Sequence, residues 1–150
     1  MNNERFTPFV LIIERITKNI KRIADLEMEQ YGLRSSHVMC ILQLAKSEGG
    51  LSSSALADAC GVDKAFISRT TSDLVKGGFI ETNQKYEDGR KYRLKYILTE
   101  KGKFVLHETK KTVEHYFSEL GNKIGEYEMN SFMRVIGMID ELAHKDQAEA

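Results

Sequence analysis

The sequence predicts a mainly α-helical protein of the α+β class, in which four helices, one β-hairpin and two further helices follow one another. Apolar residues recur at spacings of three and four over most of the 150 residues, as on one face of a helix. Only residues 79–98 change to the alternation of paired strands. Glycines and capping residues divide the remainder into segments of helix length.

The first helix is expected to begin at Thr7-Pro8, because Thr caps helices and Pro suits the first helical position. Gly32 predicts its end after about residue 30. Five apolar residues along it recur at alternating spacings of four and three: Phe9, Ile13, Ile16, Ile20 and Ile23. Such a narrow apolar seam is typical of helices that pair as in a coiled coil.

Three shorter helices are expected next. The second begins after Ser35, and the third lies within residues 53–60, where Gly61 ends it. Asp63 predicts the N-cap of a fourth over residues 64–76. Three serines offer caps for the third helix: Ser52, Ser53 and Ser54.

After the fourth helix, FIETN and YRLKYIL read as two strands, and Asp88-Gly89 between them is a strong signal for a tight turn. Thr99 predicts the cap of a fifth helix, and a sixth is expected from about Glu126. The sixth carries an apolar stripe that includes Phe132, Ile136 and Ile139.

The composition is that of an ordinary globular chain, with 41% hydrophobic and 29% charged residues. No apolar run approaches the ~18 residues that a membrane span needs, and the N-terminus lacks the layout of a secretory signal. Two cysteines in such a chain suggest reduced thiols, so we expect a cytoplasmic protein.

Charge is distributed unevenly although the net charge is zero. Lys and Arg outnumber Asp and Glu by eight to five within residues 61–96. An ordinary solvated surface can carry a basic excess of this size. The charge alone therefore does not indicate a nucleic-acid partner.

The third and fourth helices have the spacing of a helix-turn-helix. Ala57 allows close crossing, Gly61 turns the chain, and Ile67 and Leu74 are expected to pack beneath. A hairpin directly after the second helix of such a pair is a wing. The sequence therefore predicts a winged helix-turn-helix.

At the level of motifs, the chain resembles the MarR (multiple-antibiotic-resistance regulator) family of bacterial transcription factors. The resemblance rests on GVDKAFISRTTSDLVKGGFIE, on DGR in the wing and on ILTEKG after it. It implies an obligate homodimer in which residues 1–34 and 99–150 form dimerisation helices around a DNA-binding lobe of residues 35–98. The apolar stripes then supply the interface: Phe9, Ile13, Ile16 and Ile20 with Phe132, Ile136 and Ile139.

Two positions depart from the family's pattern. The wing motif of the family usually reads Asp-Arg-Arg, and Gly89 stands here in place of the middle Arg. Ala65 and Phe66 occupy positions where small hydroxyl residues are common.

Candidate DNA contacts follow from helical geometry. Lys64, Ser68, Arg69 and Ser72 lie on the face of the fourth helix opposite the expected core residues. Arg69 is the candidate for guanine, because its guanidinium fits O6 and N7 bidentately. Lys64 and the serines at 52–54 are expected to hold phosphates.

At the wing, Arg90 and Lys91 are the candidates for the minor groove, where Arg is favoured. Asp88 is expected to brace Arg90 or the turn, and Gly89 to permit the turn.

Other classes of site find little support in the sequence. The four histidines show no metal-ligand spacing with cysteines or acids, so we expect no metal and no cofactor. No nucleophile elbow, phosphate loop or dinucleotide fingerprint occurs, which argues against an enzyme. Cys40 and Cys60 are expected to be buried small hydrophobes.

The sequence predicts a transcriptional regulator that binds a pseudo-palindromic operator in double-stranded DNA as a homodimer. Of the two directions of regulation, we expect repression rather than activation. The resemblance also implies a small amphipathic or phenolic effector in the crevice between dimerisation helices and lobe, with lining residues unknown. Two alternatives stay open: a winged-helix protein-interaction module without DNA binding, and a cysteine-based redox sensor.

Overall fold

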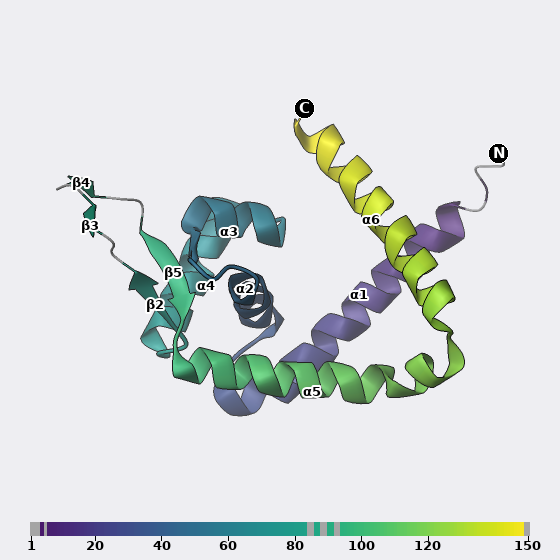
Figure 1. Ribbon diagram of the computed structural model, residues 1–150, viewed down its shortest axis with the longest axis horizontal. Helices are drawn as coiled ribbons and strands as arrows, with labels where there is room; N and C mark the ends of the chain where they lie inside the picture. The colour runs from purple at the N-terminus through teal and green to yellow at the C-terminus, as the bar shows by residue number, and fades with distance from the viewer. Residues whose placement is uncertain (1–3, 5, 84–85, 88–89, 92–93, 149–150) are drawn as a thin grey trace. The chain divides into compact units, whose positions relative to one another are not determined.

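The computed structural model describes residues 4, 6–83, 86–87, 90–91 and 94–148 (Figure 1). The chain forms two compact units, Met1–Lys111 and Thr112–Ala150. The helix α5, Glu100–Lys123, runs from the first unit into the second. The order of four helices, a small sheet with a wing and two helices confirms the predicted fold class.

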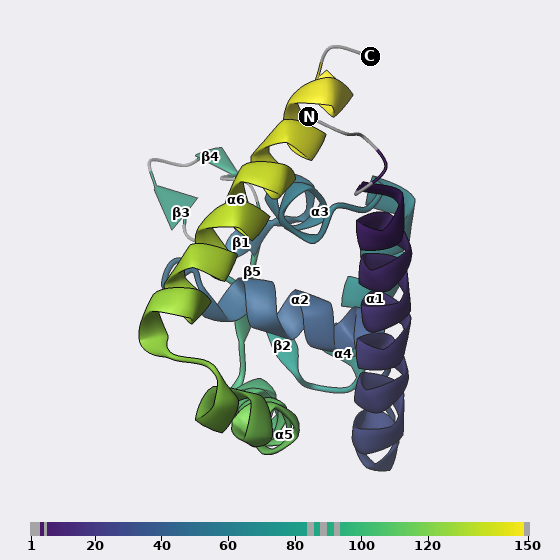
Figure 2. The same cartoon turned by 90° about the vertical axis from the view of Figure 1, so that its right-hand side faces the viewer.

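Among the four helices before the wing, a side-chain cap starts a helix in the described part of the chain only at Ser52 and Asp63, and the first helix begins at Phe6, before the predicted cap Thr7. α1 spans Phe6–Met28 and continues into a 3-10 turn, η2, over Glu29–Tyr31, which Gly32 ends with φ 69°. α2 spans Ser35–Ala45, α3 spans Ser53–Cys60 and α4 spans Lys64–Lys76. α2 is the central helix, and it packs against α1, α3, α4 and the sheet (Figure 2).

The sheet has three antiparallel strands in the order β1-β5-β2. β2 (Ile80–Asn83) pairs with β5 (Lys95–Leu98) in the register Ile80↔Leu98. β1 (Leu51–Ser52) pairs with the other edge of β5 and was not predicted, because two residues carry no periodic signal. β3 (Tyr86–Glu87) and β4 (Arg90–Lys91) form a separate two-stranded ribbon, the wing.

One hydrophobic core holds the first unit together. Its fully buried side chains come from α2, α3, α4, β2 and α5, and the largest are Ile41, Leu56, Ile67, Leu74, Ile80 and Val105. The predicted burial of Ile67 and Leu74 beneath the helix-turn-helix is therefore confirmed. All members of the core lie between residues 28 and 105.

The second strand of the hairpin is shorter than predicted. β5 begins at Lys95, and Leu94 of the predicted strand YRLKYIL is 45% exposed. Tyr96 and Leu98 do pack against the core. Tyr92 lies outside the described residues.

The second unit consists of the C-terminal half of α5 and of α6, Glu126–Ala148. Its apolar residues find little cover within the chain. Large exposed side chains include Val113, Tyr116, Phe117, Leu120, Phe132, Met133 and Met138. Among the described residues, no helix combines the length and the apolar character that a membrane span requires.

Candidate nucleic-acid interface

The helix-turn-helix is formed by α3, the turn at Gly61–Asp63 and α4. Gly61 adopts φ 66°, a left-handed conformation that glycine takes without steric cost, and its amide hydrogen bonds to the end of α3. Ile67, Thr71 and Leu74 form the buried face of α4. The Thr71 hydroxyl donates to the Ile67 carbonyl at 2.8 Å, so this buried polar group is satisfied within the helix.

The opposite face of α4 is exposed, as the spacing predicts. Four of its polar residues are open to solvent: Lys64, Ser68, Arg69 and Ser72. Within the described part of the chain, neither Lys64 nor Arg69 forms a salt bridge. Their charges are thus not neutralised by neighbouring acids, and an anionic partner can reach both.

Each helix of the motif is capped by the residue that the sequence indicates. The Asp63 carboxylate accepts a hydrogen bond from the Phe66 amide at 2.7 Å at the start of α4. The Ser52 hydroxyl accepts one from the Ala55 amide at 3.2 Å at the start of α3. Ser52 keeps its own hydroxyl proton to donate, and Ser53 and Ser54 are partly exposed beside it. The three serines therefore lie together at one helix N-terminus.

The two unusual residues of α4 point to different surroundings. Ala65 is exposed, whereas Phe66 is half-buried and lines a cavity behind the helix. The aromatic side chain of Phe66 thus faces the interior, and the exposed face of α4 still carries polar residues.

The wing consists of β3 and β4, which pair antiparallel. Tyr86 pairs with Lys91 and Glu87 with Arg90. The predicted turn residues Asp88 and Gly89 lie outside the described residues. Arg90 and Lys91 occupy β4, on the strand that leaves the turn.

The motif Leu98-Thr99-Glu100-Lys101-Gly102 ties the end of α4 to the start of α5. The Thr99 hydroxyl lies 2.6 Å from the Gly78 carbonyl oxygen and accepts from the Gly102 amide at 3.2 Å, so it caps α5 as predicted. The Lys101 ammonium donates to the Gly77 carbonyl at 2.7 Å and lies 4.3 Å from the centre of the Phe79 ring. These bonds fix where α4 ends.

A histidine that the sequence did not single out approaches α4 from α2. His37 is buried in α2, and its Nδ1 accepts a hydrogen bond from the Arg34 amide at 2.9 Å. Its Nε2 lies 3.8 Å from an Asp73 carboxylate oxygen on α4. The sequence could have indicated this role of His37 only through its position. His37 stands in the first turn of α2, whose N-cap residue, Arg34, is not of the usual capping type.

A cavity of about 260 Å³ lies behind α4, between α1, α2 and the helix-turn-helix. We call it the α4 cavity. Its wall is largely apolar, with Ile20, Val38, Met39 and Phe66 among the lining residues. Lys21 is the single charged residue among those that line it.

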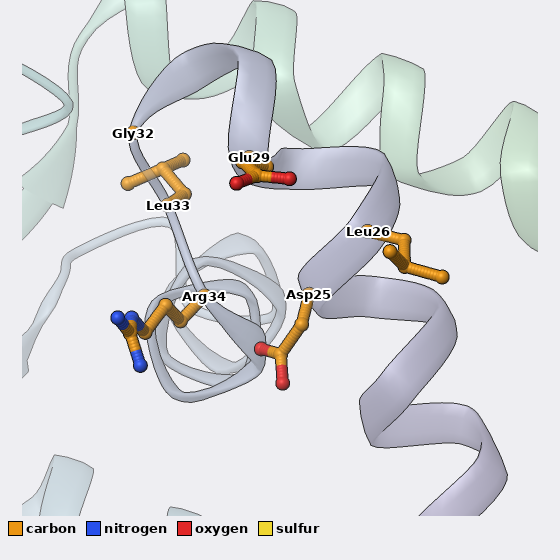
Figure 3. A pocket seen from close by; sticks show the side chains of 6 residues that line it. All are labelled: Asp25, Leu26, Glu29, Gly32, Leu33 and Arg34. Atoms are coloured by element: carbon orange, nitrogen blue, oxygen red, sulfur yellow. The ribbon is translucent and has the colours of Figure 1, made fainter.

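A second cavity, of about 340 Å³, lies at the corner between α1 and α2 (Figure 3). Two acids line it, and the Asp25 carboxylate already accepts a hydrogen bond from the Ser35 amide at 2.6 Å. In Figure 3, Leu26 and Arg34 point to opposite sides rather than toward one another. This acidic corner does not suit DNA phosphates.

Comparison with known proteins agrees with this geometry. A model of the MarR family matches residues 31–91, which contain the helix-turn-helix and reach the wing. The HTH-type transcriptional regulator BilQ of Clostridioides difficile (strain CD3) is 23% identical over 140 residues, 93% of each chain. A crystal structure of MarR is 26% identical with a TM-score of 0.71 and covers 92% of this chain and 98% of that chain. The chain is thus similar to MarR-family regulators over its helix-turn-helix and along most of its length.

Among further MarR-family structures, Staphylococcus aureus MarR in complex with salicylate and kanamycin has a TM-score of 0.76 at 17% identity and covers 95% of both chains. The matching family model and the relative BilQ are both of transcriptional regulators, which supports a DNA-binding regulator rather than an enzyme. This similarity favours the DNA-binding interpretation over the interaction module. Among the described residues, no three His, Cys, Asp or Glu residues are grouped as a metal site would require.

Proposed function

We propose that this chain is a MarR-like homodimeric repressor that binds a pseudo-palindromic operator, with α4 in the major groove and the wing in the flanking minor groove. The observation that carries the proposal is the exposed polar face of α4, whose Lys64 and Arg69 have no salt-bridge partner in the described chain. Selection of bound duplexes from random DNA tests it and yields the operator. Recovery of no preferred sequence would contradict it.

The roles of the site residues follow from their positions. Arg69 and Ser68 lie where base edges are read, with Ser72 one turn further along the exposed face. Lys64 and Ser52–Ser54 lie at the N-terminal ends of α4 and α3, where amides and the helix dipole favour phosphate. Arg90 and Lys91 are proposed to enter the minor groove from β4.

The dimer is proposed because the chain leaves its apolar stripes exposed. Ile16 and Ile20 on α1 and Phe132 on α6 are each more than two-fifths exposed, and Phe9, Ile13, Ile136 and Ile139 are half-buried. A closed two-fold dimer would bury such residues and would present two α4 helices to two half-sites. In this proposal residues 1–34 and 99–150 dimerise, and residues 35–98 bind DNA.

We further propose that a small amphipathic or phenolic effector binds the α4 cavity and changes operator affinity. The cavity is apolar, and Lys21 offers one positive charge to a carboxylate or phenolate. Phe66, on α4 itself, is part of its wall, so an occupant contacts the helix that reads DNA. The salicylate in the complex of the Staphylococcus aureus relative is a ligand of this chemical class.

Replacing Arg69 by alanine is expected to cost ~1–3 kcal/mol of affinity at the selected operator and to relax the preference at one base pair per half-site. The fold should be unchanged, because Arg69 is exposed. Arg69→Lys is the matched control: it keeps the charge but not the fork, so it should keep non-specific affinity and lose the base preference. An equal loss of affinity on every duplex would assign Arg69 to the phosphate backbone.

Replacing Arg90 by alanine is expected to weaken operator binding and to lower the slope of log affinity against log salt by about one per wing. Preference for A·T pairs at the outer edges of the site should fall, since Arg favours a narrow minor groove. Arg90→Lys should restore the salt slope without the A·T preference. Salt titrations that coincide for wild type and Arg90→Ala would show that the wing does not contact DNA.

A further inference from the structure

The first turn of α4 exposes a small apolar side chain among polar ones. Ala65 is the second residue of the helix and is exposed to solvent. Ser68 and Arg69 follow it at three and four positions, so their side chains lie next to it on the surface of the helix. Ala65 thus places a single methyl group within a surface that otherwise offers hydroxyl and charged groups.

Neighbouring contacts hold the backbone at Ala65 in place. The Asp63 carboxylate accepts a hydrogen bond from the Phe66 amide at 2.7 Å, and the Thr70 hydroxyl donates to the Phe66 carbonyl at 3.0 Å. Ile67, on the other side of the helix, is fully buried. Because alanine has no side-chain rotamers, fixing this backbone also fixes the methyl group, and a contact with it costs no side-chain entropy.

The charges near Ala65 suit the major groove of DNA. Lys64 and Arg69 are the charged residues in the first two turns of α4, and neither forms a salt bridge within the described part of the chain. Asp73 is the one acidic residue of α4, and it lies about two turns after Ala65. Apart from Asp63, whose carboxylate caps the helix, no acid of the helix or its cap is therefore close to Ala65.

A methyl group can recognise only one feature of a base edge in the major groove. The side chain of alanine neither donates nor accepts a hydrogen bond, so it cannot pair with the polar atoms that distinguish the base edges. Thymine alone among the four bases carries a C5 methyl group there. Contact between two methyl groups removes apolar surface from water, whereas a polar base edge against Ala65 would lose hydrogen bonds to water.

We propose that Ala65 is a specificity residue that contacts the C5 methyl group of one thymine in each operator half-site. This inference rests on the proposed function, in which α4 occupies the major groove. Ala65 and Arg69 are about 6 Å apart along the helix axis, and successive base pairs are ~3.4 Å apart. The thymine is therefore expected within about two base pairs of the guanine proposed for Arg69.

Replacement of thymine by deoxyuridine in the duplex obtained by selection tests the proposal, because it removes the C5 methyl group and keeps the hydrogen-bonding groups of the base. Each thymine is replaced in turn, in both half-sites together, and the dissociation constant of the full-length protein is measured. At one position the wild type should bind about fourfold more weakly per half-site, or on the order of fifteenfold for the two, as the burial of one methyl group predicts.

Ala65→Gly removes the methyl group on the side of the protein. This variant should bind the thymine and deoxyuridine duplexes equally at that position. Its affinity for unrelated DNA and its salt dependence should be those of the wild type, since Ala65 contacts no phosphate in this proposal. Ala59→Gly is the matched control, because Ala59 is exposed on α3 and lies outside the face of α4, and it should keep the preference for thymine. Thermal unfolding of both variants checks that each is folded.

Three results would overturn the proposal: a half-site without thymine within about two base pairs of that guanine, wild-type affinity that no deoxyuridine changes, or a deoxyuridine effect that is as large in Ala65→Gly as in the wild type. The last result would assign the effect to another residue or to the shape of the DNA. In each case the wild type still binds a selected duplex, so the proposed function stands and only the role of Ala65 is removed. If selection recovers no preferred duplex, the proposed function fails and this inference fails with it.

Discussion

Gly102→Ala is expected to lower the free energy of unfolding by about 3 kcal/mol or more, at the upper end of what overpacking costs. A Cβ at position 102 would lie well inside contact distance of the Phe79 backbone oxygen, and the Leu98 side chain is also close. Backbone cannot move aside as a flexible side chain can. Since Phe79 follows the end of α4, the variant should also weaken DNA binding by displacing α4.

Gly49→Ala is the matched control, because a Cβ there meets nothing within 4 Å and the residue does not need a left-handed conformation. It should change the free energy of unfolding by less than ~0.5 kcal/mol, as is usual for surface positions. Chemical denaturation of both variants and the wild type provides the measurement. A Gly102→Ala protein as stable as the wild type would show that α5 does not depend on this close approach.

The order of elements could be predicted because the signals for it are local. Ser52, Asp63 and Thr99 each cap the helix that follows, as their residue types indicate. The exposed face of α4 followed from helical periodicity alone. Such features depend on residues a few positions apart, and a single sequence shows them directly.

What the sequence did not show depends on contacts between distant segments. The motif ending in Gly102 was recognised from the resemblance, but its bonds to Gly77 and Gly78 join residues more than twenty positions apart. His37 faces Asp73 only once α2 and α4 have packed. Cys40 and Cys60 likewise line one cavity only once α2 has packed on α3. No periodicity or cap marks such pairs.

Phe132→Glu is expected to convert the protein from a dimer to a monomer at micromolar concentration, with a dissociation constant raised at least about a hundredfold, or ~3 kcal/mol. Phe132 is 56% exposed in the single chain although it lies in the apolar stripe of α6. In a two-fold interface the substitution would bury a carboxylate twice, and an unpaired buried charge is strongly unfavourable. Sedimentation velocity measures the result, and operator binding should be lost because one chain offers only one α4.

The hydrophobic core lies wholly within residues 28–105, so Phe132→Glu should retain that core and most of its helical circular dichroism. This separates dissociation from unfolding. Tyr127→Glu is the matched control, because Tyr127 is an aromatic residue of the same helix and is 84% exposed. Tyr127 lies five positions before Phe132, so its side chain points away from the apolar stripe. We expect this control to remain dimeric. A wild type that sediments as a folded monomer would remove both the interface and the mechanism of two half-sites, because nothing would then hold two α4 helices at the spacing of successive major grooves.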